Sequence, residues 1–153
     1  MTDRSITHAT FSLERTYEVP PARVFAAWAD PDAKARWFAG PAAEHELDFR
    51  IGGREVASGH DKGGRVLTFE SRYHDIVAEQ RIVYACTLHA GETLATVSVT
   101  TVEFSPLGNG TRLLLTEQGT FLDGHEEPAW REQGTRDQLA ALDAELLRTN
   151  EEA

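Results

Sequence analysis

The sequence has little cysteine and methionine, few basic side chains and no long apolar run. Its 153 residues include one cysteine and one methionine, and 25 acidic side chains outnumber 15 basic ones, giving a formal charge of -10. The lone Cys86 excludes an internal disulfide and is typical of a reducing compartment. The negative charge disfavours binding to nucleic acid and to anionic lipid surfaces. Because no apolar leader or span-length apolar segment occurs, we expect a cytoplasmic protein without membrane insertion.

The rest of the composition is that of a globular chain. Hydrophobic residues make up 41% and charged residues 26%, and no repeat or linker divides the sequence. At roughly 150 residues per domain, the length predicts one domain. We place this domain at residues 9–149, with flexible termini at 1–8 and 150–153.

The first third of the chain predicts a strand and two short helices. A strand is expected over 11–18, and Pro21 opens a helix that ends at 29, because a proline at the first helical position removes only an N–H that would be unpaired. Asp30 caps a second short helix, which carries Trp37 near its end. Alternating segments bounded by glycine turns then predict strands at 45–51, 54–60, 65–77, 81–89, 93–104 and 111–121.

The last segment returns to a helical period. Leu139, Leu142 and Leu146 share one face of a helix expected over 126–149. The short intervals between strands favour antiparallel neighbours. The prediction is an α+β fold, a curved antiparallel sheet of about six to seven strands wrapped around the C-terminal helix. Charged side chains of mixed sign on that helix predict an exposed face: Arg131, Arg136, Arg148, Glu127, Glu132, Asp137 and Glu145.

Short blocks along most of the chain carry a family resemblance. They are Val19-Pro20, Val24-Phe25, Trp28, Asp30-Pro31, Trp37-Phe38, Gly40-Pro41, Asp48-Phe49-Arg50, Gly52-Gly53-Arg54, Tyr73, Ile76-Val77, Arg81-Ile82-Val83-Tyr84, Gly110-Thr111-Arg112-Leu113, and Gly134 with Leu139, Leu142 and Leu146. In this order they resemble the helix-grip superfamily (START-like, SRPBCC), which includes pollen allergens, lipid-transfer domains and polyketide cyclases. Within it, the chain most resembles homologues of the activator of the ninety-kilodalton heat-shock protein ATPase.

The resemblance implies an internal cavity between the last helix and the sheet, open to small apolar or lipid-like molecules. The family usually places a tryptophan after the glycine of the last helix, whereas this chain has Thr135. The missing ring is expected to enlarge or reshape the space beneath the helix. The predicted cavity residues are Phe25, Trp28, Trp37, Phe38, Phe49, Phe69, Tyr73, Tyr84, Thr135, Leu139 and Leu142. The alternative is that the aromatic side chains simply fill the core.

Charged residues on the strands give a second set of candidates. Alternation puts Asp48 and Arg50 on one face and Phe49 on the other, and a solvated charged face is the ordinary interpretation. If the charged side chains instead point inward, a buried charge-paired cluster forms whose pKa values suit catalysis. The residues that would form it are Arg50, Glu70, Arg72 and Glu117; the catalytic alternative uses Asp48, Arg50 and Glu117.

Other chemistry finds little support. No zinc spacing, nucleophile elbow, phosphate-binding loop or dinucleotide motif occurs, so no metal site and no cofactor is predicted. Three functions follow, in order of preference. They are binding of a small apolar ligand, a cyclase- or hydrolase-type enzyme, and stimulation of a chaperone ATPase. The last ranks lowest because the eukaryotic activators carry an additional N-terminal domain, for which we expect no room before residue 9.

Overall fold

The computed structural model describes residues 4–40, 43–61 and 63–152. In chain order its elements are β1 (Ile6–Tyr17), α1 (Pro21–Ala29), α2 (Pro31–Lys34), the π-helical turn η1 (Ala35–Ala39), β2 (Glu44–Leu47), β3 (Arg54–His60), β4 (Val66–Val77), β5 (Arg81–Ala90), β6 (Thr93–Leu107), β7 (Gly110–Leu122) and α3 (Pro128–Glu152). Regular structure therefore extends beyond the domain boundaries expected at 9 and 149. Of the termini expected to be flexible, residues 1–3 and 153 lie outside the described residues.

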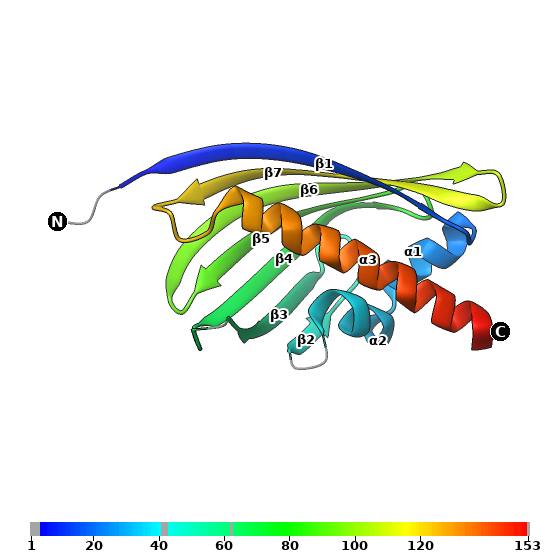
Figure 1. The fold of residues 1–153 in the computed structure, drawn as a ribbon, viewed down its shortest axis with the longest axis horizontal. Helices are drawn as coiled ribbons and strands as arrows, with labels where there is room; N and C mark the ends of the chain where they lie inside the picture. The colour runs from blue at the N-terminus through cyan, green and yellow to red at the C-terminus, as the bar shows by residue number, and fades with distance from the viewer. Residues whose placement is uncertain (1–3, 41–42, 62, 153) are drawn as a thin grey trace.

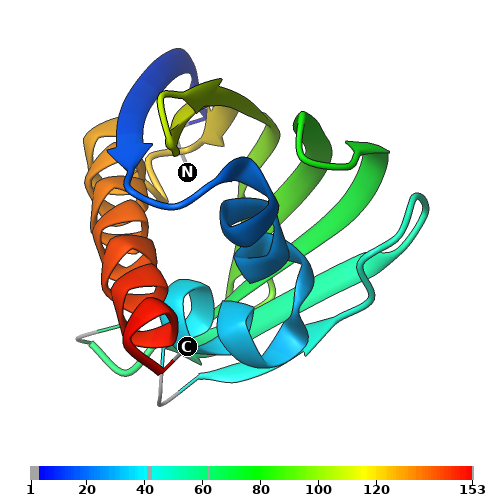
Figure 2. The same ribbon diagram turned by 90° about the vertical axis from the view of Figure 1, so that its right-hand side faces the viewer.

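Within the described residues, seven strands form one antiparallel sheet in the order β1-β7-β6-β5-β4-β3-β2. Only β1 leaves the sequence order, because it pairs with β7 along its whole length. Figure 1 shows the sheet curved across its strands, with α3 lying over the concave face. Seen from the end in Figure 2, α1 and α2 lie beside α3 at one end of the arch. The predicted α+β helix-grip fold is confirmed.

The two short helices are positioned by local signals that the sequence contains. Pro21 occupies the first turn of α1, and the Asp30 carboxylate accepts a hydrogen bond from the backbone N–H of Ala33 at 3.0 Å, which caps α2. The Trp37 indole N–H then donates to the Ala27 carbonyl at 2.9 Å. This bond ties η1 back to α1 and fixes the orientation of a buried ring that faces α3.

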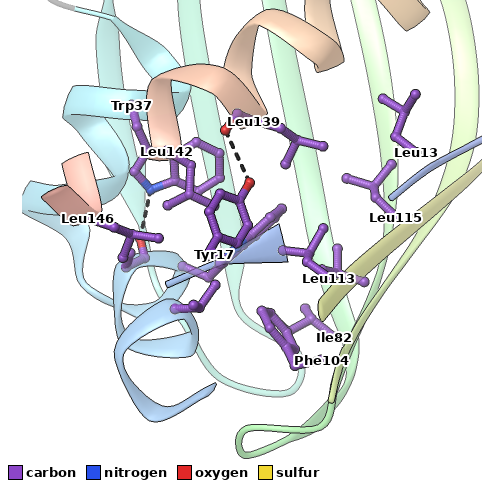
Figure 3. Close-up of a cluster of buried hydrophobic side chains, with 14 of the residues drawn as sticks. Leu13, Tyr17, Trp37, Ile82, Phe104, Leu113, Leu115, Leu139, Leu142 and Leu146 are labelled. Atoms are coloured by element: carbon purple, nitrogen blue, oxygen red, sulfur yellow. Dashed lines mark hydrogen bonds between the residues drawn. The ribbon is translucent and has the colours of Figure 1, made fainter. Parts of the chain in front are cut away.

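Apolar packing anchors the inner face of α3, and a hydrogen bond from β1 adds to it (Figure 3). Leu139, Leu142 and Leu146 are all buried against the sheet and the short helices. Burying each leucine is worth about 1.5–3 kcal/mol. At the end of β1, the Tyr17 hydroxyl donates to the Leu139 carbonyl at 3.1 Å.

Among the described residues, no helix combines the length and the apolar character needed to cross a bilayer.

The strand predicted over 45–51 is shorter in the structure. β2 ends at Leu47, and the backbone N–H of Asp48 already donates to the Arg54 carbonyl at 2.9 Å. Gly52 has a φ of 85°, a left-handed conformation that glycine adopts without strain. The chain therefore turns between 48 and 54, and Ile51 is 62% exposed. The expected alternation fails at this end because the double glycine draws the preceding residues into the turn.

Candidate functional site

A cavity of about 350 Å³ lies between α3 and the sheet. Side chains from α3 form one wall, β3, β4, β5 and β7 form the opposite wall, and α1 and η1 close one end. The concave face of the sheet is turned toward α3 (Figure 2), and the side chains of the two walls leave a space between them. The volume falls within the range of small-molecule pockets, which is about 300–1,000 Å³.

Seven of the eleven predicted cavity residues lie on this wall: Trp28, Trp37, Phe38, Phe69, Tyr84, Thr135 and Leu139. They come from five elements far apart in the sequence, and the fold brings them together around one space. Thr135 lies on the inner face of α3, and its hydroxyl donates to the Arg131 carbonyl at 3.0 Å. That these residues contact a ligand stays a prediction.

The structure corrects the prediction for the other four, Phe25, Phe49, Tyr73 and Leu142, which pack into the core instead of lining the cavity. Phe25 and Phe49 meet edge to face with ring centroids 5.6 Å apart, and Phe49 meets Tyr73 in the same way at 5.1 Å. Leu142 is fully buried. Phe49 therefore packs against both Phe25 and Tyr73, and none of the four side chains is among those that line the cavity.

A buried ion pair lies behind the aromatic wall, and the sequence analysis did not identify it. The Lys34 ammonium donates to Glu55 Oε1 at 2.8 Å and to the Tyr73 hydroxyl at 3.2 Å. That hydroxyl donates to the same Glu55 oxygen at 2.9 Å, and His45 Nε2 lies 2.7 Å from Oε2. The Lys34 Nζ atom lies 4.4–5.9 Å from the ring centroids of Trp28, Trp37, Phe38, Tyr73 and Tyr84.

The surroundings shift the pKa values of both members of this pair downward. Burial raises the pKa of the Glu55 carboxyl, but Lys34, His45 and Tyr73 together outweigh burial, so the pKa lies below its ordinary value. Burial lowers the pKa of the Lys34 ammonium, and Glu55 opposes that change. Neither Lys34 nor Glu55 lies on the cavity wall. We conclude that the pair holds α2 against β3 and so supports the aromatic wall from behind.

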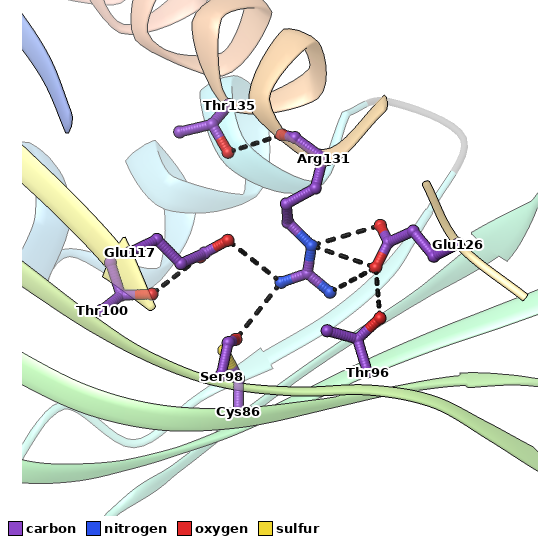
Figure 4. A network of polar contacts seen from close by, with 8 residues as sticks. All are labelled: Cys86, Thr96, Ser98, Thr100, Glu117, Glu126, Arg131 and Thr135. Atoms are coloured by element: carbon purple, nitrogen blue, oxygen red, sulfur yellow. Dashed lines mark hydrogen bonds and ion pairs between the residues drawn. The ribbon is translucent and has the colours of Figure 1, made fainter. Parts of the chain in front are cut away.

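A second polar cluster does lie on the cavity wall (Figure 4). The Arg131 guanidinium from α3 reaches Glu126 through Nε at 3.1 Å and through Nη2 at 2.8 Å. Its Nη1 lies farther from its partners, 3.4 Å from Glu117 Oε2 and 3.3 Å from Ser98 Oγ. Thr100 donates to Glu117 Oε1 at 2.8 Å. Glu117, Glu126 and Arg131 all line the cavity.

Burial and charge act differently on the members of this cluster, and for Glu117 burial prevails. Burial raises the pKa of the Glu117 carboxyl above its ordinary value, although Arg131 and Thr100 act in the opposite direction. For Arg131, burial is outweighed by Glu117 and Glu126, and the guanidinium pKa is raised. Burial also raises the pKa of the Cys86 thiol to about 11, so the thiol is protonated at neutral pH and is not a nucleophile.

The structure separates the proposed catalytic residues. Only Glu117 points inward, onto the cavity wall. Asp48 and Arg50 lie in the turn after β2, where Arg50 Nε donates to Asp48 Oδ2 at 2.8 Å and both side chains are more than half exposed. On the outer face, Glu70 pairs with Arg54, and Arg72 donates to the Gly52 carbonyl. Asp48 and Arg50 are therefore withdrawn as candidates for chemistry in the cavity.

Sequence reasoning missed several polar residues of the site. It assigned Arg131 to an exposed charged face, yet the side chain is only 8% exposed, because this end of α3 turns that position toward β6 and β7. The neighbouring Trp130 is 63% exposed and lines the mouth of the cavity. Its signal was an isolated tryptophan at the start of an otherwise polar helix. Within the described residues, no three His, Cys, Asp or Glu side chains come together as metal ligands.

Comparisons with known proteins bear on the fold and the family. A structure from Rhizobium leguminosarum is 42% identical, with a TM-score of 0.92 over 96% of this chain and 99% of that chain. One from Rhizobium loti is 46% identical, with a TM-score of 0.86 over 92% and 99%. One from Chromobacterium violaceum is 27% identical, with a TM-score of 0.75 over 88% and 94%. No curated protein matches the chain.

The family model described as activator of Hsp90 ATPase homolog 1-like protein matches residues 18–146. This span begins just before α1 and includes α3 as far as Leu146, so it contains every residue of the cavity wall. The chain belongs to the activator of Hsp90 ATPase homolog 1-like family.

Proposed function

We propose that this protein binds a small, largely apolar molecule in the cavity between α3 and the sheet. The observation that carries the proposal is the 350 Å³ cavity itself, whose wall combines aromatic side chains with one compact polar cluster. Such a composition is typical of ligand sites, in which apolar surface supplies affinity and a few polar groups set orientation. The exposed Trp130 at the mouth adds apolar surface that entering ligands would cover.

The first test is whether the protein retains a small molecule from its host. Native mass spectrometry of the purified protein, compared with the denatured mass, is expected to show a noncovalent adduct. Naphthylethanol serves as a neutral probe of the same site in isothermal titration calorimetry. We expect it to bind in a one-to-one ratio.

Thr135 offers a matched pair of variants that place the probe in the cavity. Thr135→Trp puts a large ring on the wall, whereas Thr135→Val keeps the size and removes only the hydroxyl. We expect Thr135→Trp to weaken naphthylethanol binding at least about tenfold, equivalent to about 1.4 kcal/mol, and Thr135→Val to bind as the wild type does. The proposal fails if Thr135→Trp binds the probe unchanged, or if no adduct is retained and the probe does not bind.

One observation favours a second candidate function, an enzyme of the cyclase or hydrolase kind. Glu117 is a buried carboxyl on the cavity wall with a raised pKa, a combination found in general acids and bases. Under this alternative the retained molecule is converted to a product by the wild type and bound unchanged by Glu117→Gln. Mass spectrometry of the released molecule distinguishes the two outcomes. Stimulation of a chaperone ATPase stays a prediction that the cavity does not test.

A further inference from the structure

The polar cluster on the cavity wall also indicates which ligand charge the cavity accepts. We propose that the ligand carries a protonated amine on an apolar body, and that the Glu117 carboxylate pairs with that amine. The inference rests on the proposed function, because it concerns the same cavity. Arg131 divides its hydrogen bonds unequally between the carboxylates of Glu126 and Glu117.

Arg131 is committed to Glu126. Three contacts of 2.8–3.2 Å join the Nε and Nη2 atoms of Arg131 to the Glu126 carboxylate. Thr96 also donates to Glu126, at 2.5 Å. By contrast, Glu117 receives from Arg131 only the 3.4 Å contact of Nη1, which that nitrogen shares with Ser98. Glu117 is therefore the less compensated carboxylate of the two.

The count of charges on the wall points the same way. Glu117 and Glu126 face a single guanidinium, Arg131, so one negative charge is left without an equal partner when both carboxyls are ionised. The ammonium of Lys34 does not supply the missing charge, because it lies behind the aromatic wall and is paired with Glu55. His60 on β3 also lies on the cavity wall, as a further group that can carry a positive charge. Because Glu117 is buried and weakly screened by water, such an imbalance favours a cation.

Glu117 also has room to accept further hydrogen bonds. An ionised carboxylate offers about four acceptor positions, and Thr100 and Arg131 contact one oxygen each. Burial raises the pKa of this carboxyl, because it removes the charged form from bulk water. An ammonium group would replace that water with a charge-assisted hydrogen bond. The aromatic rings of Tyr84 and Phe69 on the same wall also suit a cationic head.

The opposite arrangement, in which Arg131 binds an anionic ligand, is disfavoured by the same contacts. Its Nε, Nη1 and Nη2 atoms all already donate to protein oxygens. A ligand carboxylate that makes two hydrogen bonds with the guanidinium would displace Glu126, Glu117 or Ser98 from it. It would also lie close to Glu117, where like charges repel.

The test uses three probes that share one naphthalene body and differ only in the head group. They are naphthylethylamine, naphthylethanol and naphthylacetate, titrated by calorimetry at neutral pH. For the wild type we expect the amine to bind about tenfold or more tighter than the acetate, with the alcohol between them. Glu117→Gln should lose about tenfold in amine affinity and keep the affinity for the alcohol. Glu103→Gln, which removes an exposed carboxylate on β6, should behave as the wild type.

Each outcome decides a different claim. If the acetate binds as tightly as the amine, or if folded Glu117→Gln keeps the amine preference, the assignment of Glu117 is wrong while the proposed function stands. If none of the three probes binds, the proposed function itself fails. Circular dichroism verifies the fold of each variant. The wild-type ranking and the charge-retaining variant Glu117→Asp, which should keep the amine above the acetate, decide the question even if Glu117→Gln does not fold.

Discussion

The Nζ atom of Lys34 lies 2.8 Å from Glu55 Oε1, and neither side chain is exposed to solvent. The pair joins α2 to β3, and the Lys34 ammonium also lies 4.4 Å from the centroid of the Phe38 ring. Tyr73 and His45 satisfy further acceptor positions of the same carboxylate. A buried charge pair of this kind is stable only when complete, because each ion has lost its water and depends on its partner.

Removing one partner of this pair should therefore destabilise the fold strongly. Lys34→Met leaves Glu55 buried without its cation, and we expect the free energy of unfolding to fall by about 3–5 kcal/mol. Urea unfolding followed by tryptophan fluorescence measures this loss. Because Trp28 and Trp37 surround the Lys34 ammonium, their emission reports on the same region.

The matched control removes both charges. In Lys34→Met combined with Glu55→Gln no ion is left unpaired, and the amide still offers an oxygen to Tyr73. We expect the double variant to recover most of the stability lost in Lys34→Met, since neutral replacements of buried pairs are often tolerated. A double variant no more stable than Lys34→Met would show that the charges do not depend on each other.

The raised pKa of Glu117 predicts a specific pH dependence of stability. Between the ordinary carboxyl value of 4.5 and the raised pKa of the native protein, the native state holds a proton that the unfolded chain has released. The unfolded state then binds fewer protons, so the contribution of Glu117 to stability is full below the ordinary value and is lost as the pH rises through the raised value.

Glu117→Gln copies the protonated form at every pH and removes this dependence. We expect the stability of the variant relative to the wild type to increase as the pH is raised through this window. Denaturant unfolding of both proteins at a series of pH values measures the difference, in which titrations common to both proteins cancel. A difference that does not change with pH, or that decreases as the pH rises, would contradict the assigned direction.

The fold could be predicted from the sequence because its signals are local and repeated. Pro21, Asp30 and the leucine period of the last helix each act within a few residues, and the strands alternate between glycine turns. The polar part of the site could not be predicted, because the burial of a charged side chain depends on how the helices and strands pack. Arg131 and Arg136 look alike in the sequence, yet only Arg131 faces Glu117, whereas Arg136 pairs with Glu132 on the exposed face.

The same limit explains the overlooked Lys34. A lysine at the end of a short helix ordinarily extends into solvent, and only the approach of β3 and β4 encloses it. The aromatic residues could be assigned more easily, because a large apolar ring favours burial against any neighbour, although Trp130 is an exception. Which rings line the cavity and which fill the core depended on packing, as Trp37 and Phe49 show.

Alanine substitutions at two glycines are expected to change the stability in opposite directions. At Gly134 on α3, an added Cβ would have no heavy atom within 4 Å. At Gly119 on β7, it would lie 2.7 Å from Cε1 of Phe121, a buried ring. Gly134→Ala should stabilise the protein by about 0.5–1 kcal/mol, because alanine loses less backbone entropy in a helix. Gly119→Ala should destabilise it by about 1–3 kcal/mol through overpacking.

Thermal unfolding of the two variants beside the wild type measures both effects with the same chemical change. Opposite shifts of the melting temperature are expected, since each variant adds one methyl group. That group meets open space at Gly134 and the Phe121 ring at Gly119. Phe121→Leu in the Gly119→Ala background supplies the control, because a smaller side chain relieves the close contact and should recover part of the loss. If Gly119→Ala alone were as stable as the wild type, the Phe121 ring would have to move without cost, contrary to its burial and its close approach to Gly119.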